Sequence, residues 1–436
     1  MEKKTSNNSS DNNESAVFED GKLRSASLDF MVQYLSEANP QDQEIIPAIL
    51  VCHSTLVETK VFFLKFVEIY KGLSGNKEKQ STLLRNLYLW ITLTPEIFVG
   101  DFLIETSDFI ESLDNEYPKE ILSINEKLEF IRGIEKNEST TVLTEALQTT
   151  SVTENAKQLE EENEKEKNNK TKKKRNRRKE NQFEKPLLPR WVPLRKITLN
   201  DLKPLEIARQ LTLLQQSIYL KIKRNELVTA KWAKSNLKHL SPNILKYISK
   251  YNLISHVFTS WILSSRKKKN RAKILDKCIQ IMDICFKWGD FVTTSILKNS
   301  LSSKPILRLS NSWDLVSEKK IQTFQRTEEM FSHEKRFWKL RTIHDNTFGK
   351  CVPFPGLYLV DLTFITEGNP NDHLDNFNLH KIRLEYRVIE SFVCFQTQGK
   401  YNFKTIPQIQ KLLERTFEGD LEKIFYKSSI ELEPQN

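Results

Sequence analysis

The sequence predicts an all-α protein, and three observations support this prediction. Glycine accounts for only 11 of 436 residues and proline for 15, so the chain is poor in turn-forming residues. Apolar residues recur at three-to-four-residue spacing through most of the chain, as they do in amphipathic helices. Hydrophobic residues make up 38% and charged residues 28% of the sequence, which is polar but sufficient for a sizeable core.

The amino-terminal part divides into a polar tail and a small helical domain. Residues 1–20 consist largely of Asn, Ser and charged residues, and we expect them to be disordered. Residues 21–113 are dense in apolar side chains, which form three helical stripes. The stripes are Phe30, Met31, Tyr34 and Leu35; Val61, Leu64 and Val67; and Leu83, Leu84, Leu87, Trp90 and Ile91.

Residues 114–190 form a predicted charged linker, with helix in places. Residues 160–166 hold five glutamates, and residues 172–179 hold seven basic side chains in eight positions. The net charge of +10 is concentrated in such runs. Overall basicity therefore says little about the folded parts of the protein.

Residues 191–436 form a second, larger helical domain. The sequence Gly356–Ile365 is too short for periodicity to decide between helix and strand. Residues 366–371 carry a strong turn signal, and residues 374–395 have the pattern of a helix. We therefore predict a hairpin over about residues 357–395.

Several chemistries have no visible site in this sequence. No phosphate-binding glycine loop, zinc-binding H-E-x-x-H motif or G-x-S-x-G serine-hydrolase motif occurs. We expect no cofactor, no metal ion and no bond-making catalysis. The five cysteines are an odd number without a C-x-x-C pair, which predicts free thiols in a reducing compartment. With no secretory signal or apolar run of membrane length, we expect a cytoplasmic protein.

The second half resembles the catalytic domain of Ras-family guanine nucleotide exchange factors, of the Son-of-sevenless type. Matching motifs occur in order over about residues 196–434. They are residues 204–213, Trp232 after Glu226-Leu227, residues 241–245, residues 271–275, residues 301–309 with Trp313, residues 351–370 and residues 430–434. Residues 21–113 resemble, more weakly, the companion Ras exchanger motif domain.

The resemblance implies an all-α catalytic domain that binds a Ras-like small GTPase and inserts a protruding helical hairpin beside its nucleotide. By matching position, Thr363 and Glu367 would face the nucleotide site at the hairpin tip. The GTPase would also be contacted by four residues, namely Trp232, Ser302, Leu307 and Asn369.

Other residues of the hairpin have structural interpretations. A simpler interpretation of Glu367 is that its carboxylate holds the turn, and Asn369 also suits a role in the turn itself. We expect Tyr358, Leu359, Leu362 and Phe364 to form the hairpin core. We expect Glu385 to lie away from the tip, where its removal changes the exchange rate little.

Two alternatives stay open. The family has Asn where this chain has Ser302, which allows a catalytically weak or inactive scaffold that still binds a GTPase. A nucleic-acid-binding protein acting through residues 172–179 is disfavoured, because that run contains no aromatic residue for base stacking. The simplest interpretation of this basic block is a solvated linker. The block also suits an importin-type receptor or an anionic membrane surface, and the latter would recruit the protein to the plasma membrane.

Overall fold

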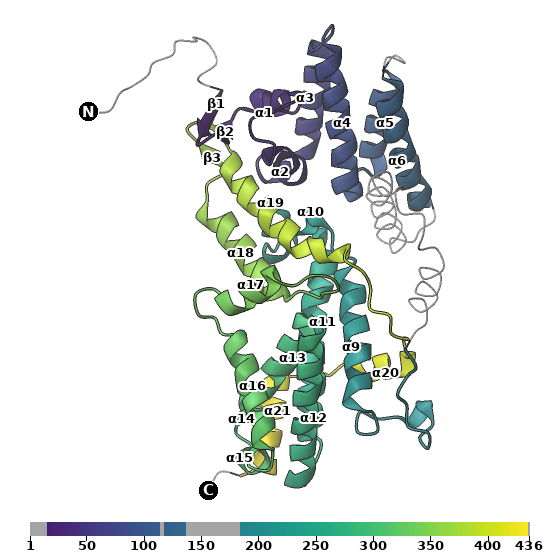
Figure 1. Ribbon diagram of the computed structural model, residues 1–436, viewed down its shortest axis with the longest axis vertical. Helices are drawn as coiled ribbons and strands as arrows, with labels where there is room; N and C mark the ends of the chain where they lie inside the picture. Colours follow the sequence, from purple (N-terminus) through teal and green to yellow (C-terminus); the bar gives the residue numbers. More distant parts are fainter. Residues whose placement is uncertain (1–14, 114–116, 137–183, 435–436) are drawn as a thin grey trace, which may run out of the picture. The chain divides into compact units, whose positions relative to one another are not determined.

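The computed structural model describes residues 15–113, 117–136 and 184–434, which are mainly helical (Figure 1). The prediction of an all-α protein is confirmed, with one small sheet as the exception. Within the described residues, no helix combines the length and apolar character needed to cross a membrane.

The chain forms two compact units. Among the described residues, the first unit contains 15–113, 117–136, 223–242 and 358–393, and the second contains 184–222, 243–357 and 394–434. The domains expected from the sequence are continuous ranges, whereas these units interleave. The difference arises because two later segments, 223–242 and 358–393, pack with the amino-terminal helices.

The first unit consists of helices with a small sheet. Its helices are α1 (Leu28–Tyr34), α2 (Ile45–Cys52), α3 (Thr59–Gly72), α4 (Lys77–Leu93), α5 (Gly100–Glu111), α6 (Pro118–Lys136), α10 (Arg224–Leu227), most of α18 (Pro355–Gly368) and α19 (Leu379–Val393), with the short 3-10 helices η1 (His53–Thr55), η2 (Pro95–Ile97), η4 (Val228–Ala233) and η5 (Lys238–Leu240). Its strands are β1 (Ala16–Glu19), β2 (Lys22–Ala26), β3 (Asp372–His373) and β4 (Asn376–Asn378).

The predicted apolar stripes become α1, α3 and α4, with one correction to the buried face. In α3 the side chains of Phe62, Phe63 and Phe66 are at most 3% exposed, whereas Val61 and Leu64 of the predicted stripe are 44% and 57% exposed. The phenylalanines are larger, so burying their face removes more apolar area from water.

α6 lies inside the range 114–190 that we interpreted as linker. Ile124, Leu128, Ile131 and Ile134 recur at helical spacing and are each at most 8% exposed. The packed helical part therefore extends to Lys136, and the charged blocks at 160–166 and 172–179 lie outside the described residues.

The sheet joins the two ends of the first unit. Its strand order is β1-β2-β4-β3, and every neighbouring pair is antiparallel. Ser25 of β2 pairs with Asn378 of β4, and Ala26 pairs with Phe377. The hairpin segment is thereby tied by backbone hydrogen bonds to the start of the chain.

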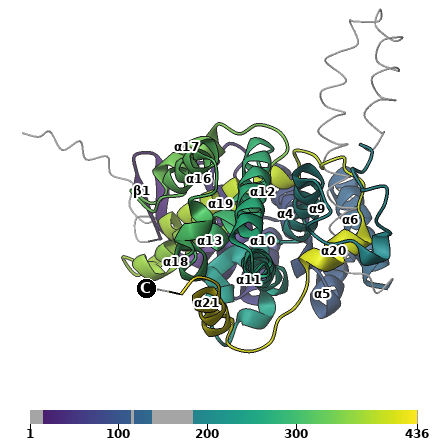
Figure 2. The same ribbon diagram turned by 90° about the horizontal axis from the view of Figure 1, so that it is seen from below.

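The second unit is a group of helices around α12, which contacts α9, α13, α15 and α16 (Figure 2). Its helices are α9 (Pro204–Tyr219), α11 (Pro242–Leu263), α12 (Lys268–Lys287), α13 (Phe291–Leu301), α14 (Lys304–Leu307), α15 (Ser310–Trp313), α16 (Glu318–Met330), α17 (Trp338–Asp345), α20 (Pro407–Leu413) and α21 (Leu421–Leu432), with the 3-10 helices η3 (Leu194–Lys196) and η6 (Cys394–Gln396).

A buried carboxylate organises the start of α13. Asp290 is fully buried, accepts a hydrogen bond from the Thr293 backbone N–H at 3.0 Å and accepts another from the Thr212 hydroxyl at 2.8 Å. The first contact caps α13, and the second ties it to α9. Burial raises the pKa of Asp290 to about 6, although the Thr293 and Thr212 hydrogen bonds lower it.

Candidate functional site

The predicted hairpin is present, with α18 and α19 as its two arms (Figure 1). The segment that periodicity left undecided is helical, because Pro355–Gly368 forms α18. The Tyr358 and Phe392 rings pack with centroids 5.0 Å apart, and Leu362 and Ile389 are completely buried. The expected core role of Tyr358 and Leu362 agrees with this packing.

The second arm begins later than we predicted. Residues 374–378 are not helical, because β3 and β4 form a two-stranded turn ahead of α19. Leu374 and Asp375 occupy the left-handed region with φ of 52° and 61°, which closes the turn but prevents a helix there.

A buried lysine fixes the tip of the hairpin. Lys381 is 3% exposed, and its Nζ donates to the carbonyls of Thr366 at 3.0 Å and Asn369 at 2.7 Å and to Asn371 Oδ1 at 2.9 Å. A cation at the carboxyl end of α18 complements the helix dipole and satisfies carbonyls that have no partner inside the helix. Burial lowers the pKa of Lys381.

Asn378 completes this hydrogen-bonded tip. Its Nδ2 donates to the Pro370 carbonyl at 3.0 Å, and its Oδ1 accepts from the Lys381 N–H at 3.1 Å at the start of α19. Asn369 Nδ2 donates to the Ile365 carbonyl at 3.0 Å. The ends of both arms are therefore held in a defined geometry.

One face of α18 is exposed. Val360 and Phe364 are 40% and 53% exposed, and Glu367 is exposed one turn further along. Thr363, on the same side, is half-buried, and its hydroxyl donates to the Leu359 carbonyl at 2.9 Å. The spacing i, i+4 and i+7 places Val360, Phe364 and Glu367 in one row.

Two expectations about α18 change. Phe364 is not a core residue of the hairpin, because its position in the exposed row turns it away from α19. Glu367 lies in the last turn of α18 rather than in the loop beyond it, since the helix continues to Gly368. The helical row was readable in the sequence, but the residue types alone favoured a buried phenylalanine.

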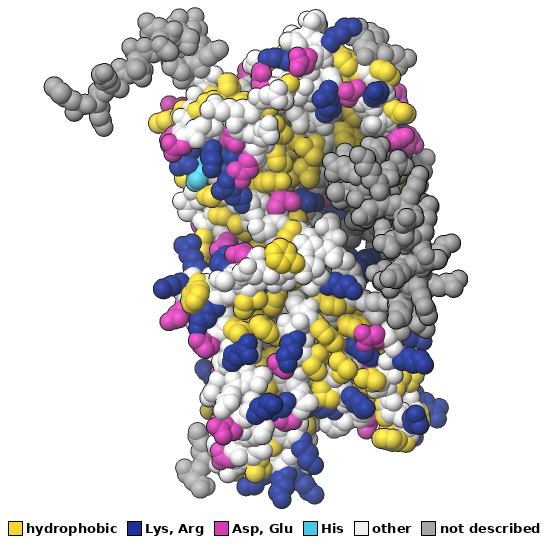
Figure 3. Space-filling view, viewed as in Figure 1, with side chains coloured by type: hydrophobic (Ala, Val, Ile, Leu, Met, Phe, Trp, Pro, Cys, Tyr) yellow, Lys and Arg dark blue, Asp and Glu magenta, His cyan; other side chains and the backbone are white. Residues whose placement is uncertain are grey.

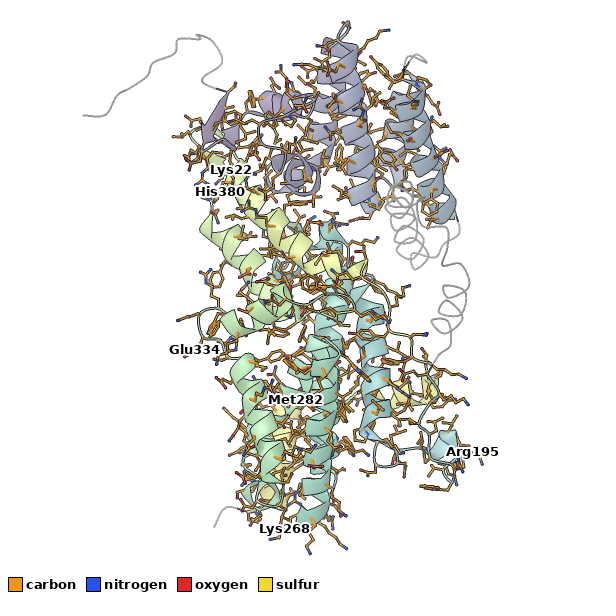
Figure 4. The ribbon with its side chains drawn as sticks, viewed as in Figure 1. Lys22, Arg195, Lys268, Met282, Glu334 and His380 are labelled. Carbon is orange, nitrogen blue, oxygen red and sulfur yellow. The ribbon has the colours of Figure 1, made fainter. Side chains whose placement is uncertain are left out.

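The other arm, α19, is anchored to the amino-terminal part by a buried ion pair. Arg383 donates to Asp42 Oδ1 at 3.0 Å and Oδ2 at 2.5 Å, and to the Leu23 carbonyl at 3.2 Å. The side chains of Arg383 and Asp42 are only 3% and 4% exposed. Figure 4 labels Lys22 and His380, which lie near this junction of β2 and α19.

A second buried contact holds the middle of α19. Glu385 is fully buried and accepts from the Thr55 hydroxyl and from the Thr229 backbone N–H, both at 2.5 Å. Thr229 has φ of 60°, a conformation that costs energy for a non-glycine residue. Burial raises the pKa of Glu385, and the hydrogen bonds from Thr55 and Thr229 lower it by a smaller amount.

Glu385 is therefore a buried structural residue whose removal would disturb packing, while the small expected effect on the exchange rate stays a prediction. The sequence showed only a carboxylate on the second arm, and its two partners lie far away along the chain. Together with Arg383, this residue joins the amino-terminal segment to the second arm of the hairpin.

Two further ion pairs continue this anchoring. Arg224 donates from Nε to Glu390 Oε1 at 2.6 Å, with both side chains about a third exposed or less. Arg387 donates to Glu44 from Nε at 2.5 Å and from Nη2 at 2.6 Å, and this pair is more exposed. Removing one partner of the exposed Arg387–Glu44 pair should cost less stability than removing one partner of the buried Arg383–Asp42 pair.

The four expected GTPase contacts are in different surroundings. Trp232 is 8% exposed, within η4 of the first unit, and Asn369 serves the hairpin tip. In the second unit, the Ser302 hydroxyl donates to Glu328 Oε1 at 2.5 Å, and Leu307 is 50% exposed. Of the four, Leu307 offers the clearest apolar surface.

The sequence between residues 206 and 383 matches the RasGEF domain. Among curated proteins, "Ras guanine nucleotide exchange factor J" of Dictyostelium discoideum is 33% identical over 58% of this chain and 31% of its own length. "Ras guanine nucleotide exchange factor I" of the same organism is 28% identical over 95% of this chain and 47% of its own length. "Ras-specific guanine nucleotide-releasing factor 1" of Rattus norvegicus is 32% identical over 53% of this chain and 19% of its own length. The matched regions span less than half of each relative.

Proposed function

Because residues 206–383 match the RasGEF domain, we propose that this protein promotes GDP release from a Ras-like small GTPase. The observation that carries the proposal is the hairpin. The row of Val360, Phe364 and Glu367 is exposed on α18. The other arm, α19, is anchored through the buried charges of Arg383 and Glu385. A stiff wedge with an exposed face suits a protein that must deform its partner.

The mechanism follows from thermodynamic linkage. Exchange factor and nucleotide each weaken the other's binding to the GTPase by the same factor. A nucleotide held with nM to pM affinity has about 12–16 kcal/mol of binding free energy, and the exchange factor offsets part of it through its own contacts. The protein regulates a GTPase and needs no acid, base or nucleophile for this task.

At the hairpin tip, the Glu367 carboxylate would compete with the magnesium ion for a hydroxyl group of the GTPase. In GTPases of this class a Ser or Thr hydroxyl of the phosphate loop binds Mg²⁺. The Glu367 carboxylate would accept a hydrogen bond from that hydroxyl in the nucleotide-free complex. Thr363, one turn earlier on the same side of α18, would exclude the ion by its bulk.

The remaining interface is proposed to include Leu307 and Ser302 as direct contacts. Trp232 and Asn369, which are buried or engaged in the tip, would support the interface by fixing the backbone around them. Residues 21–113 would act as a Ras exchanger motif domain that braces α19.

A catalytically weak scaffold is the second candidate. Ser302 replaces the Asn of the family motif, and its hydroxyl is already bonded to Glu328. In that case the GTPase would still bind, through Leu307 and the exposed row of α18, but its nucleotide would leave slowly.

We further propose that the protein acts in the cytoplasm and reaches the plasma membrane through residues 172–179. Seven basic side chains in that block would each contribute roughly 1 kcal/mol near an anionic surface.

Release of a fluorescent GDP analogue from a panel of Ras-subfamily GTPases tests the exchange function. The full chain should accelerate release from at least one member, and Glu367→Ala should slow it by roughly 10- to 150-fold if a charge-assisted hydrogen bond acts wholly on release. Phe364→Ser should weaken GTPase binding, because it removes apolar area from the exposed row.

Glu111→Ala is a matched control. Glu111 is also an exposed glutamate in the last turn of a helix of the first unit, α5, and it should leave the release rate unchanged. Binding of a GTPase without faster release would favour the scaffold. If Glu367→Ala exchanges normally, the placement of the wedge is wrong. Loss of folding in that variant would mean that the carboxylate holds the turn.

A further inference from the structure

The loop between α11 and α12 carries a run of cations that the proposed exchange function does not use. α11 ends at Leu263 and α12 begins at Lys268. The four residues from Arg266 to Lys269, two at the end of the connection and two in the first turn of α12, are all exposed, and we name residues 266–269 the basic loop. Figure 3 shows dark-blue side chains gathered at the lower end of the molecule, where Figure 4 labels Lys268.

The charge around the basic loop is uncompensated. Residues 264–275 contain six basic and no acidic residues. Arg271 pairs with Glu433 at 2.6 Å, but within the described part of the chain the other five form no ion pair. Cations at the start of a helix also face the positive end of its dipole. A run of like charges without a partner inside the protein is a candidate for an interaction outside it.

Arg271 fixes the backbone of the basic loop. Its side chain is 1% exposed, and Nη1 donates to the carbonyls of Ser265 at 3.0 Å and Arg266 at 2.8 Å. Nε donates to the Ser312 hydroxyl at 2.9 Å. One buried arginine thus holds the loop from inside, so the four neighbouring cations remain in solvent at a defined place.

We propose that the basic loop docks the protein onto an anionic membrane surface. The four cationic side chains are flexible, and no binding pocket formed by the described residues surrounds them. Such side chains suit a surface of anionic lipid headgroups, whose negative potential attracts basic residues without fixed contacts. Residues 264–273 contain no aromatic side chain on which a nucleic-acid base could stack. Two weak attachments in one chain bind more tightly than either alone, and the separate block at 172–179 is proposed to provide the other attachment.

The test uses the full chain and vesicles of phosphatidylcholine with or without phosphatidylserine. Changing residues 266–269 to Gln should lower the partition coefficient onto phosphatidylserine vesicles at least tenfold, since each cation contributes roughly fivefold. Binding should vanish without phosphatidylserine and weaken steeply with salt. The control changes Lys71, Lys119, Lys319 and Lys411 to Gln, which removes the same charge from scattered exposed sites and should have less than a threefold effect.

The block at 172–179 can bind vesicles by itself, so both variants are also measured with its seven basic residues changed to Gln. In that background the loop variant should lose the remaining binding, while the control keeps it. The proposal fails if loop and control variants bind alike in both backgrounds. It also fails if the loop variant keeps vesicle binding but loses binding to a polynucleotide. Melting curves establish that each variant is folded, and retained exchange activity separates this result from the proposed function.

Discussion

Removal of one partner of the Arg383–Asp42 pair should destabilise the first unit strongly. Arg383→Met keeps the aliphatic stem but leaves the Asp42 carboxylate, which is 4% exposed, without its counter-charge. Breaking a buried pair in this way typically costs about 3–5 kcal/mol. The lower part of that range is expected, because Asp42 Oδ2 still accepts from the Leu23 N–H at 2.9 Å.

The measurement is thermal unfolding followed by circular dichroism. For a unit of this size, a loss of about 3–5 kcal/mol lowers the melting temperature by roughly 6–20 °C. The double variant Asp42→Leu/Arg383→Met should recover most of the loss, since neither charge is then left buried and unpaired. The nucleotide-release rate of Arg383→Met should also fall, because α19 loses its anchor behind the exposed face of α18.

An exposed pair provides the comparison. Lys60 and Glu105 lie 2.6 Å apart on the surface of the same unit, and Lys60→Met should leave the melting temperature nearly unchanged. If Arg383→Met melts like the unaltered protein, then the buried pair does not anchor the hairpin. Equal losses in the single and double variants would likewise show that the charges are not coupled.

Two further predictions concern buried carboxylates. Glu385→Ala should destabilise the first unit by at least about 2 kcal/mol in urea unfolding, because the Thr55 hydroxyl and the Thr229 N–H lose a buried acceptor; an unchanged midpoint would contradict this. Burial raises the pKa of Asp290 from 3.8 to about 6, so ionisation disfavours the folded state increasingly as pH rises between these values. Asp290→Asn should therefore gain about 2 kcal/mol of stability relative to the unaltered protein between pH 4 and pH 7, and a difference that does not vary with pH would refute the assignment.

Local sequence patterns predicted most of the helices and the hairpin, but they left α18 undecided and placed α6 in a linker. Low glycine content and helical periodicity predicted an all-α chain, and the turn signal at residues 366–371 separated two arms. The order of motifs from residue 204 to residue 370 also indicated the family that the comparison of residues 206–383 supports. These features depend only on residues that are close together in the sequence, so they can be recognised without knowledge of the tertiary structure.

Tertiary structure alone decided which polar side chains are buried and which apolar ones are exposed. Arg383 and Glu385 look like solvent-facing charges in the sequence, but their partners Asp42 and Thr55 lie more than three hundred residues earlier. Phe364 looks like a core residue, yet it is 53% exposed. Helical spacing tells which side chains share a face, whereas burial depends on what packs against that face. That choice is made by segments far apart in the chain, here the amino-terminal helices that meet α19.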